Sequence, residues 1–439
     1  MNIMNKISKY LNFVLSKYTY ASIFVFYSFF KTFKYFVRYK FPTYLMILYG
    51  LLILLYKLTD ARNKFGTISE ILPSLLITLS ACISIVASKS FNFDNLKLLL
   101  MFLVSLLVLL PEDKNDSDEM IYKKMYQFCL LVAVLFFIYT FISFLYYVIV
   151  GNAENRPMGM LNELTYFAQS IVACIGASVY CFIYTRNINI KMFATINFIF
   201  QSFVLFLTLQ RGSLYGYFIA MIFLSYIAIN YFDNTKVRIN KNVILVVMVS
   251  LVLLFVILSV SGKFNVKLII DRFTAGLALR EYIYKFGFMA MVYHRNYLFG
   301  ATRGGIYDKW HQYLQVSFEY WKEPYEKYSI VRGCIDEVAI HSTVLEQLFV
   351  HGIFGLLSLL YLYFKIVYKV FISVFKKRLT NDQLALVASS LFCLIAVMFD
   401  SFFNRALLFD IVYPQNLCFF VFAGALFRLI DSNKMKVVN

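Results

Sequence analysis

The sequence predicts an all-α, polytopic membrane protein. Of its 439 residues, 61% are hydrophobic, with 48 Phe and 34 Tyr, and the mean hydropathy is +0.70. A soluble domain has about half apolar residues and could not bury this many. The apolar residues also fall into runs of about 17–25, the length that a spanning helix needs. These runs predict about twelve spans, near residues 11–30, 42–58, 70–88, 95–110, 122–150, 164–184, 193–210, 212–232, 243–261, 341–370, 384–403 and 414–430.

The N-terminal run is expected to stay in the protein as a helix, although Lys17 interrupts it. No small-residue cleavage site follows it, and further spans come soon after, so it does not read as a removed signal peptide. The polar stretch 111–119 reads as an ordinary turn. Six prolines and the absence of a Gly/Ser-rich linker favour one membrane domain over residues 1–439.

Basic residues predict the orientation of the spans. If the N-terminus is cytoplasmic, most Lys and Arg of the short loops face the cytoplasm, as the positive-inside rule requires. The clusters at 236–238 and 376–378 both point inward, so the loop between the ninth and tenth spans faces outside. Basic residues at 31–40 break the rule and leave the number of spans near the N-terminus open. The net charge of +18 is explained by juxtamembrane turns that face anionic lipid, and nucleic acid is not an expected partner.

The outer loop, residues 262–340, is the longest polar stretch and is expected to be partly helical. All four histidines and both tryptophans lie in it or within the next eleven residues. Within it, 272–287 reads as a helix with Phe273, Leu277, Ile283 and Tyr284 on one face and Arg280 at its edge. The side chains suited to chemistry are therefore concentrated around this loop.

Three residues stand out as candidates for a site at the outer boundary. Arg211 lies between two apolar spans, where a charge is costly unless it snorkels, pairs or lines a wet cavity. Alternatively, Arg211 has only a structural role, in which it caps a tight helical hairpin and anchors to lipid headgroups. The forked guanidinium of Arg280 suits the binding of phosphate, but taken alone Arg280 could equally be a solvated surface charge. His341 opens the tenth span, where it suits general-base work or simply sits among headgroups.

Several classes of site have no support in the sequence. No histidine pair has i,i+3 or i,i+4 spacing, and no Cys/His cluster has zinc-like spacing, so we expect no metal. Phosphate-loop, dinucleotide and nucleophile-elbow motifs are absent, and no cofactor is expected. Cys334 is the only outer-loop cysteine, so no disulfide framework is implied.

Four segments, taken in order, resemble those of a known family. They are Leu207-Thr-Leu-Gln-Arg-Gly-Ser213; Arg280-Glu-Tyr-Ile-Tyr284 followed by Leu298-Phe-Gly-Ala-Thr302; His341 to Leu356 with its Gly-Ile-Phe-Gly-Leu end; and, more weakly, Arg156-Pro-Met-Gly159. The pattern is similar to the bacterial O-antigen ligase and O-antigen polymerase superfamily of membrane enzymes. Gln210 stands where that family usually has serine.

The resemblance implies a metal-independent glycosyltransferase of the bacterial cytoplasmic membrane, with its active site on the extracytoplasmic face. Its donor would be a glycan on undecaprenyl diphosphate, and its acceptor a sugar hydroxyl. Arg211 and Arg280 would hold the diphosphate, and His341 would orient or deprotonate the acceptor. Arg156, Arg303 and Trp310 are further expected substrate contacts. Besides membrane lipids, a flippase and a chain-length regulator are further expected partners.

Alternatives stay open at this point. A polymerase extends a lipid-linked repeat of O-antigen or capsule, whereas a ligase transfers the glycan to lipid A core or protein; we favour the polymerase. A transporter would fit twelve spans, but no internal repeat is visible. The loop aromatics, Trp310 among them, fit either sugar stacking or an interfacial aromatic belt.

Overall fold

The computed structural model describes residues 11–31, 41–59, 68–88, 93–113, 116–150, 164–231, 277–302, 305–336, 340, 342–375, 379–404 and 413–430. Every regular element in these ranges is a helix, as the composition predicts. They are α2 (Lys17–Lys31), α3 (Phe41–Thr59), α4 (Ile68–Ser88), α5 (Phe93–Leu109), α6 (Asp118–Ile149), α7 (Leu164–Tyr184), α8 (Ile188–Thr208), α9 (Arg211–Tyr231), α12 (Leu277–Tyr293), α13 (Gly305–Lys327), α14 (Ser329–Asp336), α15 (Thr343–Val374), α16 (Asn381–Ser390), the π-helix η2 (Leu391–Ala396), α17 (Val397–Phe403) and α18 (Pro414–Leu429).

The described residues contain seven helices long and apolar enough to cross a membrane. Three shorter apolar helices accompany them, Thr43–Thr59, Leu100–Leu109 and Pro414–Leu429. The prediction of a membrane-embedded, polytopic helical protein is therefore confirmed. Each predicted span coincides with a described helix except 243–261, which lies outside the described residues. The total of twelve spans and the outer placement of the loop stay predictions. The seven candidate spans are Glu70–Ala87, Asp118–Ile149, Leu164–Tyr184, Ile188–Thr208, Arg211–Ile229, Thr343–Val374 and Asn381–Phe403.

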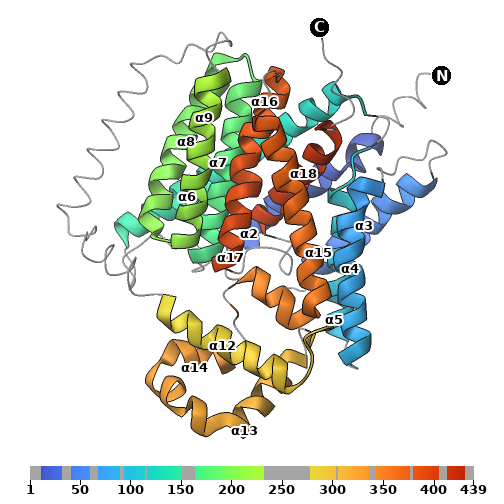
Figure 1. Cartoon of the computed structure of the whole chain (residues 1–439). Coiled ribbons are helices and arrows are strands. Elements are labelled where there is room, and N and C mark those ends of the chain that lie inside the picture. The colour runs from blue at the N-terminus through green and yellow to red at the C-terminus, as the bar shows by residue number, and fades with distance from the viewer. Residues whose placement is uncertain are drawn as a thin grey trace.

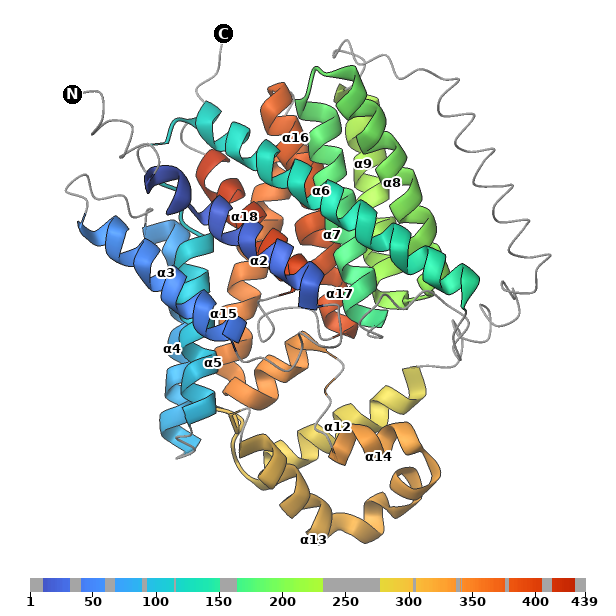
Figure 2. The same ribbon diagram turned by 180° about the vertical axis from the view of Figure 1, so that it is seen from behind.

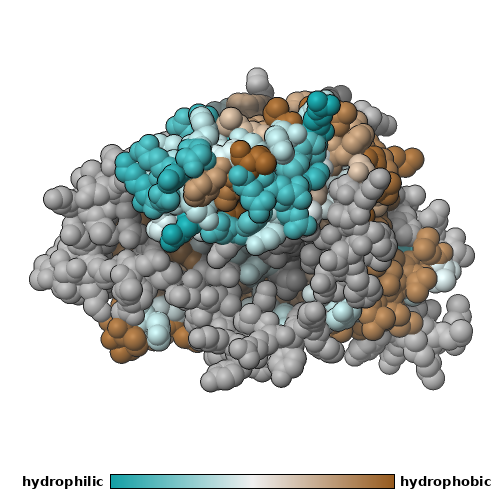
Figure 3. Space-filling view, turned by 90° about the horizontal axis from the view of Figure 1, so that it is seen from below, coloured by the Kyte–Doolittle hydropathy of each residue, from teal (hydrophilic) through white to brown (hydrophobic). Residues whose placement is uncertain are grey.

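The helices form a bundle with a smaller lobe at one end (Figures 1 and 2). The lobe consists of α12, α13 and α14, the described part of the predicted outer loop. Each part has its own apolar core, and the lobe's core extends into α15 through Phe349 and Val350. Figure 3 views the molecule from the lobe's end, where hydrophilic residues gather on the surface. The long polar segment is thus a packed unit and not only a connecting loop.

Two glycines fasten the lobe to the bundle by letting two backbones cross. Gly352 interrupts α15 with φ of 69°, and Gly300 has φ of 73°. A Cβ on Gly300 would lie 2.2 Å from the Val350 carbonyl oxygen, and one on Gly352 would lie 2.2 Å from that of Leu298. A residue with a left-handed backbone conformation and no space for a Cβ atom can only be glycine. The two motifs Leu298–Thr302 and His351–Gly355 therefore meet in space.

The break in α15 leaves carbonyl groups without helical partners, and the lobe supplies donors for them. The amide of Ala301 donates to Phe349 O over 3.0 Å, and that of Thr302 donates to Val350 O over 2.9 Å. Ser84 of α4 adds a hydroxyl bond of 2.8 Å to the same Val350 oxygen. In return, the amide of Ile353 donates to Tyr297 O over 2.9 Å. Satisfying freed backbone groups is what allows a broken helix at membrane depth.

A second close approach joins α9 to the helix that contains η2. A Cβ on Gly216 would lie 2.4 Å from the carbonyl oxygen of Ala396, the last residue of η2. Small residues at such crossings let membrane helices pack backbone to backbone. Gly216 therefore allows the backbones of α9 and η2 to approach closely. The π-helix, which often marks functional regions, runs directly into α17.

The bundle end away from the lobe holds paired charges. Lys17, at the start of α2, pairs with Glu112 and donates to Leu109 O over 3.2 Å. Tyr18 also donates to Glu112, over 2.8 Å, and Lys57 pairs with Asp113 at 3.0 Å. The polar stretch 111–119 connects α5 to α6, as expected, but Glu112 within it is buried. Ion pairs and hydrogen bonds hold this turn against α2 and α3, because charges that are removed from water need partners within the protein.

We expect Gly216→Ala to destabilise the purified protein by about 1–3 kcal/mol, because its methyl group would overlap the Ala396 carbonyl, and backbone cannot move aside cheaply. Thermal unfolding in detergent measures the effect. The matched control is Gly333→Ala in α14, where a Cβ would meet nothing within 4 Å. That change should be neutral or stabilising, since alanine favours helix over glycine. Equal melting temperatures for the two variants would contradict the close contact.

Candidate functional site

Asn404 is the residue at which the candidate segments meet. It follows α17, and only 2% of it is exposed. Its side-chain oxygen accepts from Gln210 Nε2 at 3.0 Å and from Arg280 Nη2 at 3.5 Å. Its main-chain oxygen accepts from both the amide and the hydroxyl of Thr343, at 3.2 and 3.3 Å. One asparagine therefore joins α17 to the starts of α9, α12 and α15, a group we call the Asn404 junction.

Arg280 reaches the junction from the fourth residue of α12. Its Nη1 donates to the Phe403 carbonyl oxygen over 2.6 Å, in addition to the contact with Asn404. Tyr284, one turn further along α12, lies beside it: burial raises the pKa of Tyr284, and the neighbouring guanidinium offsets part of that rise. Arg280 is half-buried, so the alternative explanation of Arg280 as a freely solvated surface charge does not hold. A guanidinium held in this way is fixed in position for recognition of an anion.

Arg211 is the first residue of α9 and lies at the same end of the bundle. α8 ends at Thr208, Leu209 takes a left-handed conformation with φ of 53°, and α9 begins at Arg211. The tight helical hairpin of the alternative explanation for Arg211 is therefore present. Cationic residues are unusual at a helix N-terminus, where the macrodipole is already positive, and the combination favours an anionic ligand.

Gly212 and Ser213 seat this helix start against α17. A Cβ on Gly212 would lie 2.0 Å from Asp400 Oδ1 and 2.3 Å from Asn404 Nδ2. Ser213 donates its hydroxyl to Asp400 Oδ2 over 2.9 Å. Gln210 also donates to Thr165 of α7, over 3.3 Å. The motif around Arg211 is thus held by three polar bonds, one to α7 and two to the end of α17, and glycine is required at 212 for the approach.

Asp400 is the residue that sequence reasoning missed. Its exposure is 1%, and it accepts bonds from Ser213 and from the Asn404 side chain. It is a lone carboxylate near the end of the apolar run 384–403, and an ionisable residue inside a span is by default a candidate for function. That signal was present in the sequence. No such signal marked Asn404, because an asparagine at the end of a span is common.

The position of His341 lies outside the described residues, as do those of Arg156 and Arg303. The residues that follow His341 are described. Ser342 caps α15 by accepting from the amide of Leu345 over 3.3 Å, and Thr343 makes its two bonds to Asn404. The helix start that follows the predicted base is therefore fastened to the same junction as Gln210 and Arg280.

Trp310 does not lie where its predicted role requires. Only 2% of it is exposed, and its indole packs edge-on against Phe286 and Phe349, with ring centroids 5.2 and 6.1 Å apart. It is a core residue of the lobe, so its ring faces are not open to a sugar. Trp321 is buried in the same core. Other rings of the lobe are exposed, among them those of Tyr293, Tyr307 and Tyr320, and they keep the two explanations proposed for the aromatic residues open.

The junction can do a limited set of chemistry. Among the described residues no group of three or more His, Cys, Asp or Glu could hold a metal ion. What the geometry offers is an arginine-bearing helix start, a second arginine anchored to the end of α17, and a buried network that fixes both. Such an arrangement can bind and stabilise an anionic group through preorganised donors.

Comparison with known proteins gives no relative: no family model matches the chain, and neither does any curated protein.

We expect Asn404→Ala to loosen the attachment of the lobe, because it removes the side-chain acceptor for the half-buried donors of Gln210 and Arg280 and takes one hydrogen-bond donor from the buried carboxylate of Asp400. The lost bonds should cost about 1–3 kcal/mol. Hydrogen exchange should rise in the first turns of α9 and α12, whereas the start of α15 keeps its bonds to the main-chain oxygen of residue 404. Gln315→Ala, an exposed change on α13, is the control and should leave exchange there unchanged. Unaltered protection in Asn404→Ala would show that the junction does not hold these helices.

Proposed function

We propose that the protein is a glycosyltransferase of the bacterial cytoplasmic membrane that polymerises lipid-linked oligosaccharide repeats of a surface polysaccharide. The donor is a glycan on undecaprenyl diphosphate, and the reaction takes place at the extracytoplasmic face. The observation that carries the proposal is the Asn404 junction. Segments 193 residues apart in the chain, around Gln210 and Phe403, are joined there with Arg280 and the start of α15.

The proposed chemistry is a direct displacement. The acceptor hydroxyl attacks the anomeric carbon of the donor sugar, the bond from that carbon to the diphosphate oxygen breaks, and the electron pair leaves with the diphosphate. His341 takes the proton of the attacking hydroxyl. Arg211 and Arg280 hold the diphosphate and stabilise the charge that develops on it, the task that a divalent cation performs in other enzymes. A single displacement inverts the anomeric centre.

Asp400 and Asn404 act in this proposal as positioning residues. Asp400 contacts Ser213 and Asn404, and Asn404 contacts Arg280, so neither needs to touch substrate. Their bonds fix the relative placement of the two arginine-bearing helices before substrate arrives. Preorganised charge is worth more than charge that must reorganise during the reaction.

A ligase would use the same site with another acceptor, and nothing in the described residues selects an acceptor. Buried charged residues inside the spans would favour a transporter. Asp400 is such a charge, but its bonds to Ser213 and Asn404 tie it into the junction. Lys17 and Lys57 are paired with Glu112 and Asp113 at the opposite end of the bundle. These contacts favour fixed packing over a moving ion path, so the glycosyltransferase remains the better supported function.

Substituting Arg211, Arg280 or His341 by alanine should each reduce long-chain glycan at the cell surface by about 100-fold or more, the usual scale for loss of one charge-stabilising group. Gel laddering of surface polysaccharide, at expression matched to wild type, measures the effect. Arg332→Ala removes an exposed arginine from α14 and serves as the control. Normal ladders in all three site variants would sink the assignment. Accumulation of full-length glycan on its lipid carrier, with none transferred onward, would instead indicate a ligase.

Activity of the purified protein on a lipid-linked repeat should persist when a chelator of divalent cations is added, because the proposal gives the charge-stabilising role to Arg211 and Arg280. Product formation before and after chelation, with re-addition of Mg²⁺ as the companion sample, measures this. Loss of turnover on chelation with recovery on Mg²⁺ would contradict the role given to the arginines.

A further inference from the structure

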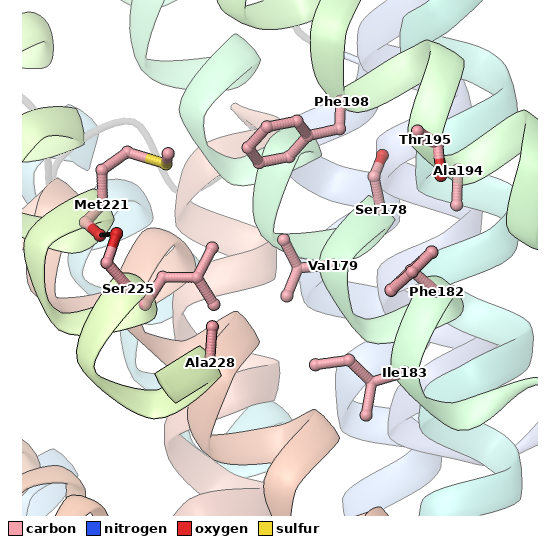
Figure 4. Close-up of a pocket in the computed structure, with 11 residues that line it drawn as sticks. Ser178, Val179, Phe182, Ile183, Ala194, Thr195, Phe198, Met221, Ser225 and Ala228 are labelled. Carbon is pink, nitrogen blue, oxygen red and sulfur yellow. Dashed lines mark hydrogen bonds between the residues drawn. The ribbon is translucent and has the colours of Figure 1, made fainter. Parts of the chain in front are cut away.

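A cavity of about 300 Å³ lies between α7, α8 and α9, in the half of the bundle away from the Asn404 junction (Figure 4). At ~1.5 Å of rise per residue, Met221 and Ala228 lie about 15 and 25 Å along α9 from Arg211. The hydrocarbon core of a bilayer is about 30 Å thick. The cavity therefore belongs to the leaflet opposite to the junction.

The cavity exists because α8 and α9 diverge. They are joined by the two-residue turn at Leu209 and Gln210, and α8 packs along α7 for much of its length while it contacts α9 little. The wedge that opens between them is lined by side chains such as Val179, Phe198 and Met221, which Figure 4 shows pointing into one space.

The lining offers no polar group to a ligand. Its three hydroxyls belong to Ser178, Thr195 and Ser225, and each donates to a carbonyl of its own helix one turn earlier, at 3.0, 2.9 and 2.8 Å. All the other lining side chains are hydrocarbon or thioether. A cavity of this kind stays dry, and ~150 Å³ of such space is enough to bind benzene. This one fits a segment of a hydrocarbon chain.

The surroundings show where such a chain comes from. Ile222, Ile229 and Ile196 are exposed on α9 and α8 beside the cavity, so in a membrane this face meets lipid tails. At the end nearer the α7–α8 turn, the Lys191 ammonium lies 5.8 Å from the ring centroid of Phe182, which lines the cavity. Within the described part of the chain Lys191 forms no ion pair.

Arg186, in the turn between α7 and α8, adds a second exposed cation at this end, although Asp382 of α16 interacts with it electrostatically. Of these two described cations, Lys191 is the one without an acidic neighbour among the described residues, so it is available to an outside anion. Apolar space that ends at a basic residue near the membrane surface matches one kind of molecule, a lipid with an anionic headgroup.

We propose that this cavity is a binding site for an anionic phospholipid of the leaflet opposite to the Asn404 junction. One acyl chain fills the wedge between α8 and α9, and the phosphate rests on Lys191. The proposal stands on the cavity and its charges and does not require the glycosyltransferase assignment.

The test uses the full-length protein in detergent and native mass spectrometry with phosphatidylglycerol, or phosphatidylcholine of the same chains. The wild-type protein should retain phosphatidylglycerol preferentially. Ala228→Phe, which fills the cavity, should lower retention about tenfold, as expected when even two methylene groups lose their apolar contact. Leu357→Phe, which adds a ring at an exposed apolar position on α15, is the control and should retain lipid as wild type does.

Lys191→Gln should abolish the preference for phosphatidylglycerol while binding of the acyl chain persists. Lys123→Gln, which changes an exposed basic residue on α6, should keep the preference of wild type. Equal retention by Ala228→Phe and wild type, or no headgroup preference in wild type, would overturn the proposal.

A measurement on wild-type protein covers the case in which Ala228→Phe fails to fold. Phosphatidylglycerol with a photoreactive diazirine on one acyl chain should label peptides that contain Phe198 or Met221. Excess unlabelled phosphatidylglycerol should suppress this labelling, and polyprenyl phosphate should not. Labelling only elsewhere, or displacement by polyprenyl phosphate in preference to phospholipid, would refute the assignment of the occupant.

Discussion

The structure depends on one constraint: polar groups taken away from water at the end of a membrane bundle must find partners within the protein. Asp400 and Asn404 are both almost fully buried, and their demand for partners is met by residues from α9, α12 and α15. Because an unpaired buried carboxylate or amide is costly, these helices cannot separate independently. The junction is therefore a structural requirement first, and the positions of Arg280 and of the helix start that carries Arg211 follow from it.

Glycine supplies the second condition, since the polar bonds form only if the backbones approach closely enough. Gly212 allows α9 to lie against Asp400, and Gly216 continues the same contact to the end of η2. Gly300 and Gly352 allow the lobe to cross α15 and donate to the carbonyls that the interrupted helix exposes. The sequence motifs around these glycines thus encode contacts between distant segments and not only local turns.

The helices could be predicted from the sequence because membrane helices are recognised by length and apolarity, which are local properties. The hairpin at Arg211 was predictable for the same reason. Asn404 was not, since its role comes from partners at positions 210, 280 and 343, and no local pattern marks such a meeting point. The burial of Trp310 was not predictable, because aromatic residues of a loop look alike in sequence whether they face solvent or a core, and the lobe's separate core had no local signal.

The α8–α9 hairpin links the two ends of the bundle in a physically specific way. Its turn is fixed at the polar junction by Gln210 and Ser213, and α8 and α9 separate from there toward the cavity. The cavity lies about 15–25 Å further along α9. The same pair of helices therefore meets two opposite demands, because polar groups must be paired at the turn while only apolar side chains line the space between the helices further on. The apolar cavity and the polar junction share no residue and are the two ends of one helical hairpin.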